Sequence, residues 1–381
     1  MMKVINTKND IVKEVIVIGA NHHNTLSIIR CLGKQGLIVD LILIDEELGF
    51  VADSKYIRNC ILVNSANEVL LHLNHRGAEK RIIFSCSDDI SSILNDNYNE
   101  LIEFYHFFNC SKQGQLTSYM NKYEQTIIAK ECGFSIPKSL IVEKNNCYDF
   151  QTYPCIVKPL ASINGGKSLF FCDNANELNL LINKYSSNCP LLIQEKINIK
   201  YEIVILGLSV NNDIIIPGYI YKYRELVGGT TYSAVYSINT LDEKLIVAAR
   251  ELVQTMKYEG LFGIECAFDG EEFKFIEINL RNDATTFALS VAGVNLPYVY
   301  YLSKCDVTYN SLISNEIRNI TSMVEFRDIS FVLKGKLHPY KWYKELKNAE
   351  CLYYYDKEDL KPYKTAKKQF MLNIIKKLIK F

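Results

Sequence analysis

The sequence predicts an α/β fold in which an open parallel sheet at the N-terminus precedes a larger α+β region. An apolar run at residues 14–20, an amphipathic segment at 24–34 and a second apolar run at 37–45 follow the strand–helix–strand order of a parallel sheet. A Gly-rich segment at 161–168 follows a further buried strand. Residues 263–281 predict a hairpin of two strands that carries polar side chains.

The composition is that of an ordinary globular chain. The 381 residues predict two to three domains, with 48% hydrophobic and 23% charged residues. The formal net charge is zero, which gives no case for nucleic-acid binding. Residues 1–13 are polar and no apolar run approaches the roughly 20 residues of a bilayer span, so we expect a cytoplasmic protein without a signal peptide. The twelve cysteines form no C-x-x-C pair, which favours buried thiols in a reducing compartment.

Polar residues follow the first and a later strand of the expected N-terminal sheet. The turn after residue 20 has the sequence NHHN rather than the glycine pattern of dinucleotide sites, which counts against a dinucleotide-dependent oxidoreductase. His22 in this turn is a candidate substrate contact, and a solvated turn histidine is the alternative. Asp88 and Asp89 lie at the end of the strand that begins at Arg81, where they either face a ligand or cap a helix.

The hairpin at residues 263–281 concentrates oxygen ligands. Glu265 lies on its first strand and Glu277 on its second, each among apolar neighbours, with an Asp-Gly turn between them. Asn279 and Arg281 follow Glu277 at intervals of two residues, so they share one strand face. Carboxylate and amide oxygens together with substrate phosphates suit Mg²⁺, and the guanidinium suits the remaining phosphate charge. Solvated acids on an exposed hairpin are the alternative.

This hairpin resembles the metal-binding signature of the ATP-grasp ligases, in which one strand carries an acid and the next carries E-x-N, with an Arg soon after. The resemblance covers about residues 15–310. It implies a two-subdomain α+β ATP-grasp core, with ATP and Mg²⁺ as cofactors and Mn²⁺ as an alternative ion. It also implies Glu265, Glu277 and Asn279 as metal ligands and Arg281 as a catalytic residue.

A second group of residues predicts contacts with the nucleotide. Lys158 interrupts an apolar strand, where a lysine must find a partner or lower its pKa. The glycines and lysine that follow can fold over a triphosphate, although Gly-rich hairpin loops are also common without a ligand. By resemblance Lys167 is also catalytic, and the segment from Gln194 runs under the adenine. The residues that the resemblance assigns to ATP are Lys122, Lys158, Gly165, Gly166, Lys167, Ser168, Gln194, Glu195, Lys196, Ile197 and Glu202.

Four further residues are candidates for binding the substrate. Lys222 and Arg224 precede a Gly-Gly pair and predict a clamp for an anionic substrate, with a solvated strand end as the rival interpretation. Asn282 and Thr285 come directly after the hairpin, where the family commonly binds its substrate.

The resemblance divides the chain into four parts and predicts a reaction. The expected parts are an N-terminal pre-ATP-grasp α/β domain at 1–115, a subdomain with the Gly-rich phosphate loop at 116–188, a subdomain with the metal site at 189–310, and a C-terminal extension with a basic amphipathic helix at 311–381. The expected activity is a carboxylate–amine ligase that forms an amide through an acylphosphate, acting on an amino acid or on the carboxylate of a glycan or sugar acid. The alternative is an ATP-binding regulatory or scaffolding module without turnover.

The expected partners are a small-molecule carboxylate and a small-molecule amine, and a homodimer is left open. Residues 361–381 hold seven lysines and no acid. Met371, Ile374, Ile375 and Leu378 share one helical face, with lysines opposite, so this helix either docks on the protein's own body or lies on the inner face of an anionic membrane.

Overall fold

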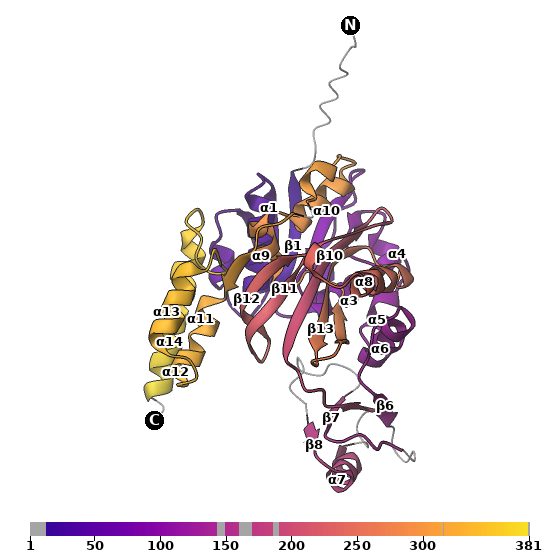
Figure 1. The fold of residues 1–381 in the computed structure, drawn as a ribbon. Helices are drawn as coiled ribbons and strands as arrows, with labels where there is room; N and C mark the ends of the chain where they lie inside the picture. The colour runs from indigo at the N-terminus through magenta and orange to yellow at the C-terminus, as the bar shows by residue number, and fades with distance from the viewer. Residues whose placement is uncertain (1–12, 143–148, 160–169, 186–189, 315, 380–381) are drawn as a thin grey trace.

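The computed structural model describes residues 13–142, 149–159, 170–185, 190–314 and 316–379. It contains a five-stranded, a seven-stranded and a four-stranded sheet (Figure 1). The predicted Gly-rich loop, including Gly165, Gly166, Lys167 and Ser168, lies outside the described residues.

The five-stranded sheet is parallel and has the order β3-β2-β1-β4-β5. Alternate residues of β1 enter different cores: Val15 and Val17 pack into the largest core, with helix α1, while Ile16 and Ile18 pack into a second core, with helix α3. Burial on both faces explains why this strand is apolar without alternation. The elements of this part are β1 (Glu14–Ala20), α1 (His23–Gly33), β2 (Ile38–Ile44), β3 (Ile57–Val63), α2 (Val69–His72), β4 (Arg81–Ser85), α3 (Asp88–Asp96), α4 (Tyr98–Leu101) and β5 (Tyr105–His106).

The seven-stranded sheet has the order β14-β13-β10-β11-β12-β15-β16, and its pairs are antiparallel except for β15 and β16. Its core is continuous with that of the N-terminal sheet, so the two sheets are held as neighbours by one apolar cluster. The predicted hairpin is confirmed as β13 and β14, with Gly270 at positive φ in the turn. The elements are β10 (Tyr201–Val210), β11 (Asp213–Leu226), β12 (Gly229–Ser237), α8 (Glu243–Thr255), β13 (Gly260–Phe268), β14 (Phe273–Asn279), α9 (Thr286–Ala292), α10 (Leu296–Lys304), β15 (Ile320–Met323) and β16 (Cys351–Leu352).

The four-stranded sheet, with the order β6-β9-β7-β8, forms a small lobe with helix α7 below the rest of the molecule in Figure 1. It has its own apolar core, to which Val157 and Leu178 belong. Strand β9 pairs with β6 and β7, so this sheet extends past the domain boundary expected at residue 188. The elements that lead into the lobe and form it are α5 (Gln115–Tyr119), α6 (Lys122–Glu131), β6 (Ser139–Val142), β7 (Cys155–Pro159), β8 (Phe170–Cys172), α7 (Ala175–Tyr185) and β9 (Leu191–Glu195).

The last 70 residues or so are part of the core rather than a separate extension, because β15 and β16 continue the seven-stranded sheet. The remaining helices gather at one side of the molecule, away from the four-stranded lobe (Figure 1). They are α11 (Glu325–Asp328), α12 (Ser330–Leu333), α13 (Pro339–Asn348) and α14 (Leu360–Ile379).

A buried ion pair ties this C-terminal part to the N-terminal sheet. Arg30 of α1 is fully buried, and its Nε lies 3.1 Å from Asp359 Oδ2. Its remaining donors reach the backbone carbonyls of Tyr353, Tyr354 and Asp359 at 2.9–3.0 Å. Asp359 also accepts hydrogen bonds from Ser54 and from the Lys55 N–H, so both charges are fully hydrogen-bonded.

We expect Arg30→Met to lower the free energy of unfolding by about 3–5 kcal/mol, because Asp359 would remain buried without its partner. The matched control is Arg58→Met, which removes a half-exposed arginine paired with Asp40 on the surface and should cost less than about 1 kcal/mol. Urea unfolding of both variants measures the two values. Equal losses would show that the buried pair adds nothing to stability.

Candidate active site

The site is built on the register of strands β13 and β14. Glu265 lies directly opposite Glu277, and Gly263 lies opposite Asn279, with a bulge immediately after the two glutamates. Two carboxylates that face each other across a strand pair repel, so the arrangement needs positive charge close by. Two lysines from other elements supply it.

Lys222 of β11 compensates Glu265. Its Nζ lies 2.6 Å from Glu265, 2.9 Å from Glu202 and 3.1 Å from Glu225, so one ammonium group serves three carboxylates. Burial would lower the pKa of Lys222, but attraction by Glu265 and Glu202 outweighs it, and the pKa is raised. Burial and the repulsion of Glu277 raise the pKa of Glu265 to about 7, against the attraction of Lys222.

Lys122 compensates Glu277. It is the first residue of α6, where Asn121 caps the helix by accepting from the backbone N–H groups of Tyr123 and Glu124. Its Nζ lies 2.9 Å from Glu277 Oε2. Burial would raise the pKa of Glu277, but the positive charge of Lys122 outweighs this effect and lowers the pKa.

Arg281 joins the hairpin to the N-terminal sheet. Its Nη2 donates to Asn279 Oδ1 at 2.9 Å, and its Nε donates to Asp88 Oδ1 at 2.9 Å. Asp88 lies in the first turn of α3, while the cap of that helix is Ser87. The hairpin and the end of a parallel strand therefore meet at one guanidinium.

These groups line one cavity of about 1020 Å³ between the two larger sheets. The hairpin acids, Lys122, Lys222 and Arg281 line it. The turn at His22, the Gly228–Thr231 loop and residues around Thr285 line it as well. The cavity is large enough for a ligand as well as phosphate groups.

Lys158 is half-buried in the four-stranded lobe, within the apolar strand that the sequence predicted. Its Nζ donates to Gln194 Oε1 at 3.2 Å, and Gln194 in turn donates to Ser139 Oγ at 3.0 Å. Burial and the repulsion of Lys122 lower the pKa of Lys158 to about 8. This lysine therefore has no carboxylate of its own in the described part of the lobe, which suits a partner that brings negative charge.

The segment predicted to lie under adenine follows directly. Glu195 donates its backbone N–H to the Lys138 carbonyl and Lys196 donates its own to the Pro154 carbonyl, at 2.9 and 3.0 Å. The Lys196 side chain lies over the ring of Phe171. Ile197 follows the end of β9, and its role in nucleotide binding stays a prediction.

The clamp expected from Lys222 and Arg224 is wrong. Lys222 is held by three carboxylates, while Arg224 pairs with Asp328 at 2.7 Å and with Glu345 at 2.7 Å, outside the cavity. The cause is strand geometry, because the two side chains face different partners across a bulged pair of strands. Neither charge is free for an anionic substrate.

The other substrate candidates have different surroundings. His22 and Thr285 line the cavity. Asn282 is fully buried behind it, where its amide donates to Asn24 and its backbone carbonyl accepts from Asn24. Its position supports the turn after β1 rather than a ligand contact. Glu202, assigned to the ribose by resemblance, holds Lys222 through one of its oxygens.

Sequence reasoning missed Glu225 and Asp283, which line the cavity, and Arg327, which contacts the loop that lines it. Glu225 lies three residues after Lys222, a spacing that becomes informative only when the strand bulge is known. Asp283 lines the cavity beside Thr285, whose N–H and hydroxyl both donate to its Oδ1. Arg327 comes from the C-terminal part, in which the sequence suggested no site.

The donor set fits a hard divalent cation completed by phosphates. No group of three His, Cys, Asp or Glu side chains that could hold a metal alone occurs among the described residues. Glu265, Glu277 and Asn279 instead offer two carboxylates and one amide oxygen on adjacent strands. Mg²⁺ is usually bound in this way, through one or two carboxylates with the remaining positions taken by water and substrate phosphate.

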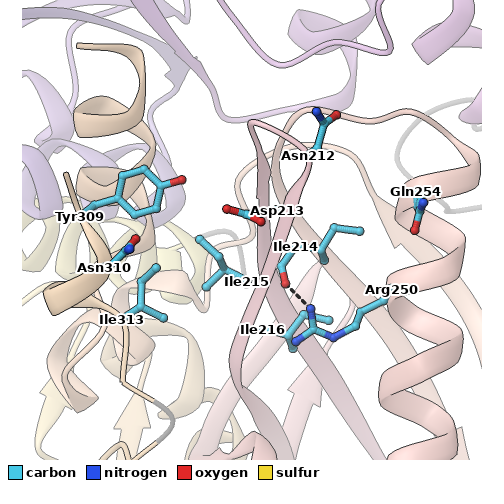
Figure 2. Close-up of a pocket in the computed structure, with 10 residues that line it drawn as sticks. All are labelled: Asn212, Asp213, Ile214, Ile215, Ile216, Arg250, Gln254, Tyr309, Asn310 and Ile313. Atoms are coloured by element: carbon cyan, nitrogen blue, oxygen red, sulfur yellow. Dashed lines mark hydrogen bonds between the residues drawn. The ribbon is translucent and has the colours of Figure 1, made fainter. Parts of the chain in front are cut away.

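A second cavity, of about 420 Å³, lies at the opposite end of β11 (Figure 2). Arg250 of α8 crosses it and donates to the backbone carbonyl of Ile214. Asp213 is the single carboxylate among the residues that line it, and aliphatic side chains fill much of the wall. Its chemistry supports packing rather than a reaction.

Comparison with known proteins agrees with this geometry. The model of the ATP-grasp domain matches residues 127–291. D-aspartate ligase of Enterococcus faecium is 21% identical over 246 residues, which are 58% of this chain and 57% of that protein. The arginine-specific carbamoyl phosphate synthase large chain of Halalkalibacterium halodurans is 29% identical over 171 residues, which are 42% of this chain and 16% of that protein. The chain thus spans between about a sixth and 57% of these relatives.

Solved structures share the fold over most of the chain. N5-carboxyaminoimidazole synthetase of Staphylococcus aureus superposes with a TM-score of 0.64 and 14% identity, covering 85% of this chain and 86% of that one. L-amino acid ligase of Bacillus licheniformis gives 0.60 and 14%, covering 81% and 78%. The region that matches the ATP-grasp domain, residues 127–291, contains the predicted metal hairpin.

Proposed function

We propose that the protein is an ATP-dependent carboxylate–amine ligase that works through an acylphosphate. The observation that carries this proposal is the convergence of Glu265, Glu277 and Asn279 with Lys122 and Arg281 in one large cavity. Its volume of about 1020 Å³ leaves space for organic substrates. A nucleotide, a metal and two substrates are what such a ligase must hold together.

The hairpin would hold Mg²⁺, or Mn²⁺ in its place, through Glu265, Glu277 and Asn279. When bound, the ion would withdraw negative charge from the phosphate oxygens. In the free protein, the positive charge of Lys222 balances the negative charges of Glu265, Glu202 and Glu225. The acids are therefore held in place before any ligand arrives, which lowers the cost of assembling the site.

The chain's own cations act at the terminal phosphate. Lys122 and Arg281 approach the cavity from α6 and from the end of β14, on either side of Glu277. In the proposed reaction the γ-phosphoryl group passes to an oxygen of the substrate carboxylate and ADP leaves. The amine nitrogen then attacks the acyl carbon, a C–N bond forms, and phosphate leaves with the former carboxylate oxygen. Positive charge near the γ-phosphate favours this route over an adenylate, which would need charge at the α-phosphate.

An ATP-binding module without turnover is the alternative. It would need the nucleotide contacts but not the full set of acids and cations. Glu265, Glu277, Asn279 and Arg281 are all present and mutually oriented, which favours an enzyme. The substrates are small molecules in this proposal. The names of two similar proteins, D-aspartate ligase and L-amino acid ligase, support an amino acid as one of them, with the carboxylate of a glycan or sugar acid as the other option.

We expect purified protein to release ADP and phosphate in equal amounts, with amide product, only when both a carboxylate and an amine are supplied. Glu277→Gln and Asn279→Ala should fold normally and lose at least about a hundredfold in kcat, because each removes an oxygen ligand at the transferring phosphate. Coupled ADP assays over a panel of amino acids and sugar acids provide the measurement.

The matched control is Glu271→Gln, an exposed acid in the turn of the same hairpin, which should keep the wild-type rate. AMP release would refute the acylphosphate route. ATP binding without consumption over the whole panel would favour the regulatory module.

Lys158 gives the site a pH dependence. Because its pKa is about 8, we expect the Kd of a non-hydrolysable ATP analogue to rise roughly tenfold between about pH 7 and pH 9.5, as the ammonium group loses its charge. Lys158→Arg should remove this dependence, because a guanidinium stays charged. Fluorescence titration of the analogue measures both proteins.

The lowered pKa of Lys158 also makes the stability of the fold depend on pH: stability should rise over the pH range in which ATP binding weakens. Unfolded Lys158 holds its proton up to about pH 10.5, so the free energy of unfolding should increase as the pH rises from about 8 toward 10.5.

An unchanged Kd of the ATP analogue in the wild type, or the same pH profile of this Kd in Lys158→Arg, would exclude Lys158 from phosphate binding.

We also propose that the C-terminal helix contacts an anionic membrane surface. Its first half packs on the protein, with Ala366 buried and Phe370 stacked on Phe326. In its second half Met371 and Ile375 are 49% and 46% exposed, so the protein's own body does not cover the face they share. Lysines at 364, 367, 368 and 376 are exposed on the same helix. No helix in the described ranges is long and apolar enough to cross a bilayer, so the contact would be peripheral.

Sedimentation with vesicles tests the contact. We expect binding to vesicles that contain phosphatidylglycerol, weaker binding at high salt, and loss of binding when lysines 364, 367, 368 and 376 are changed to glutamine, since each contributes about 1 kcal/mol near such a surface. The control changes four exposed lysines elsewhere, at 112, 130, 244 and 257. Equal sedimentation of all three proteins would reject the membrane contact.

A further inference from the structure

An arginine from the C-terminal region contacts two segments that line the cavity. Arg327 lies on α11, and its Nη1 and Nη2 donate to the backbone carbonyls of Gly228 and Val227 at 2.9 and 3.0 Å. Both carbonyls belong to the loop that lines the cavity. The same Nη1 lies 3.4 Å from Nε2 of His22, which comes from the turn after β1.

The contact between His22 and Arg327 cannot be an ordinary hydrogen bond. Nδ1 of His22 caps helix α1 by accepting from the backbone N–H of Asn24, which is always a donor. A neutral imidazole has one proton, so that proton must be on Nε2. Burial, with the positive charges of Arg327 and Arg281, lowers the pKa of His22 to about 4 and keeps the ring neutral. Two donors, Nε2–H and the guanidinium, therefore face the same space.

The positive charge of Arg327 has no counter-charge in the described part of the chain. Arg327 donates to the two carbonyls, and the neutral histidine is its other polar neighbour. The acids beside it on α11 point elsewhere: Glu325 accepts from the backbone N–H groups of Tyr354 and Tyr355, and Asp328 pairs with Arg224. Burial lowers the pKa of Arg327, which is the effect of holding a cation away from water without a partner.

We propose that His22 and Arg327 bind a carboxylate that the reaction does not consume, carried by one of the two substrates. The proposal rests on the cavity being the ligase site. One oxyanion would accept from both donors and supply the single negative charge that Arg327 lacks. The reacting group of the same substrate would then lie toward Arg281 and the hairpin, since His22 and Arg281 line the same cavity.

The first test detects the site without turnover. Two-dimensional ¹⁵N–¹H spectra of histidine-labelled protein report which ring nitrogen carries the proton and how it responds to a ligand. We expect His22 protonated on Nε2, and a shift of that signal on adding succinate that equal ionic strength of sodium chloride does not produce. A proton on Nδ1, or equal responses to succinate and chloride, would overturn the proposal whatever the enzyme's activity.

Two variants separate the subsite from the scaffold. His22→Asn keeps a favourable N-cap for α1 but removes the donor at Nε2. Arg327→Gln removes the charge. Each should weaken succinate binding roughly tenfold to a hundredfold by calorimetry, with His22→Asn leaving the unfolding midpoint unchanged. The control is Arg318→Gln, a surface arginine that also donates to a backbone carbonyl, and it should bind succinate as the wild type does.

The second test uses turnover and identifies the substrate that carries the carboxylate. For each acid and amine that supports ADP release, the analogue with its non-reacting carboxylate converted to a carboxamide is assayed. Wild-type KM should rise roughly tenfold or more for one partner only, and in Arg327→Gln the acid and its carboxamide should become equivalent. Discrimination that persists unchanged in Arg327→Gln would reject the subsite. Absence of any ADP release would refute the ligase proposal, while the succinate experiment would still decide the binding site.

Discussion

The site depends on two carboxylates that are forced to face each other. The register of β13 and β14 sets Glu265 opposite Glu277, and each is stable only because a lysine from another element lies within 3 Å of it. Lys122 lies on α6, the helix that leads into the four-stranded lobe. Lys222 lies on β11, which is separated from β13 by β10 in the seven-stranded sheet. The position of both elements is therefore linked to the same pair of charges.

The charge balance of the free protein also prepares it for a ligand. A cation at the hairpin would add positive charge and a triphosphate in the cavity would add negative charge. In the free protein, lysines and acids already lie next to each other at this place. The ammonium group of Lys222 would then exchange attraction to Glu265 for its other acids, Glu202 and Glu225. Little of the backbone has to move for this exchange, because all three acids and the lysine lie on paired strands or next to them.

The sequence was sufficient for features that depend on local pattern, and insufficient for those that depend on register. The apolar run of β1 and the turn at Gly270 follow from propensities that act over a few residues, and both elements are present. The pairing of Lys122 with Glu277 was not predicted, because it joins residues 155 positions apart that the family resemblance assigned to ATP and to the metal separately. Arg224 was misjudged because a bulge turns it toward Asp328 and Glu345, and the sequence carries no signal for a bulge. Arg327 was missed because its neighbour is His22, which lies 305 positions earlier in the chain.

The pairing of Arg30 with Asp359 has a consequence for how the protein is made. The two residues are separated by 329 positions, so on a ribosome that adds about 5–20 residues per second the helix α1 emerges roughly 15–65 s before its partner is synthesised. Throughout that interval the nascent N-terminal sheet carries a guanidinium that the finished fold buries completely. The contacts of Arg30 with Asp359 can form only after that residue has been synthesised. A late step of maturation is thus an event at the first helix, and its timing is set by the synthesis of the segment that contains Tyr353, Tyr354 and Asp359.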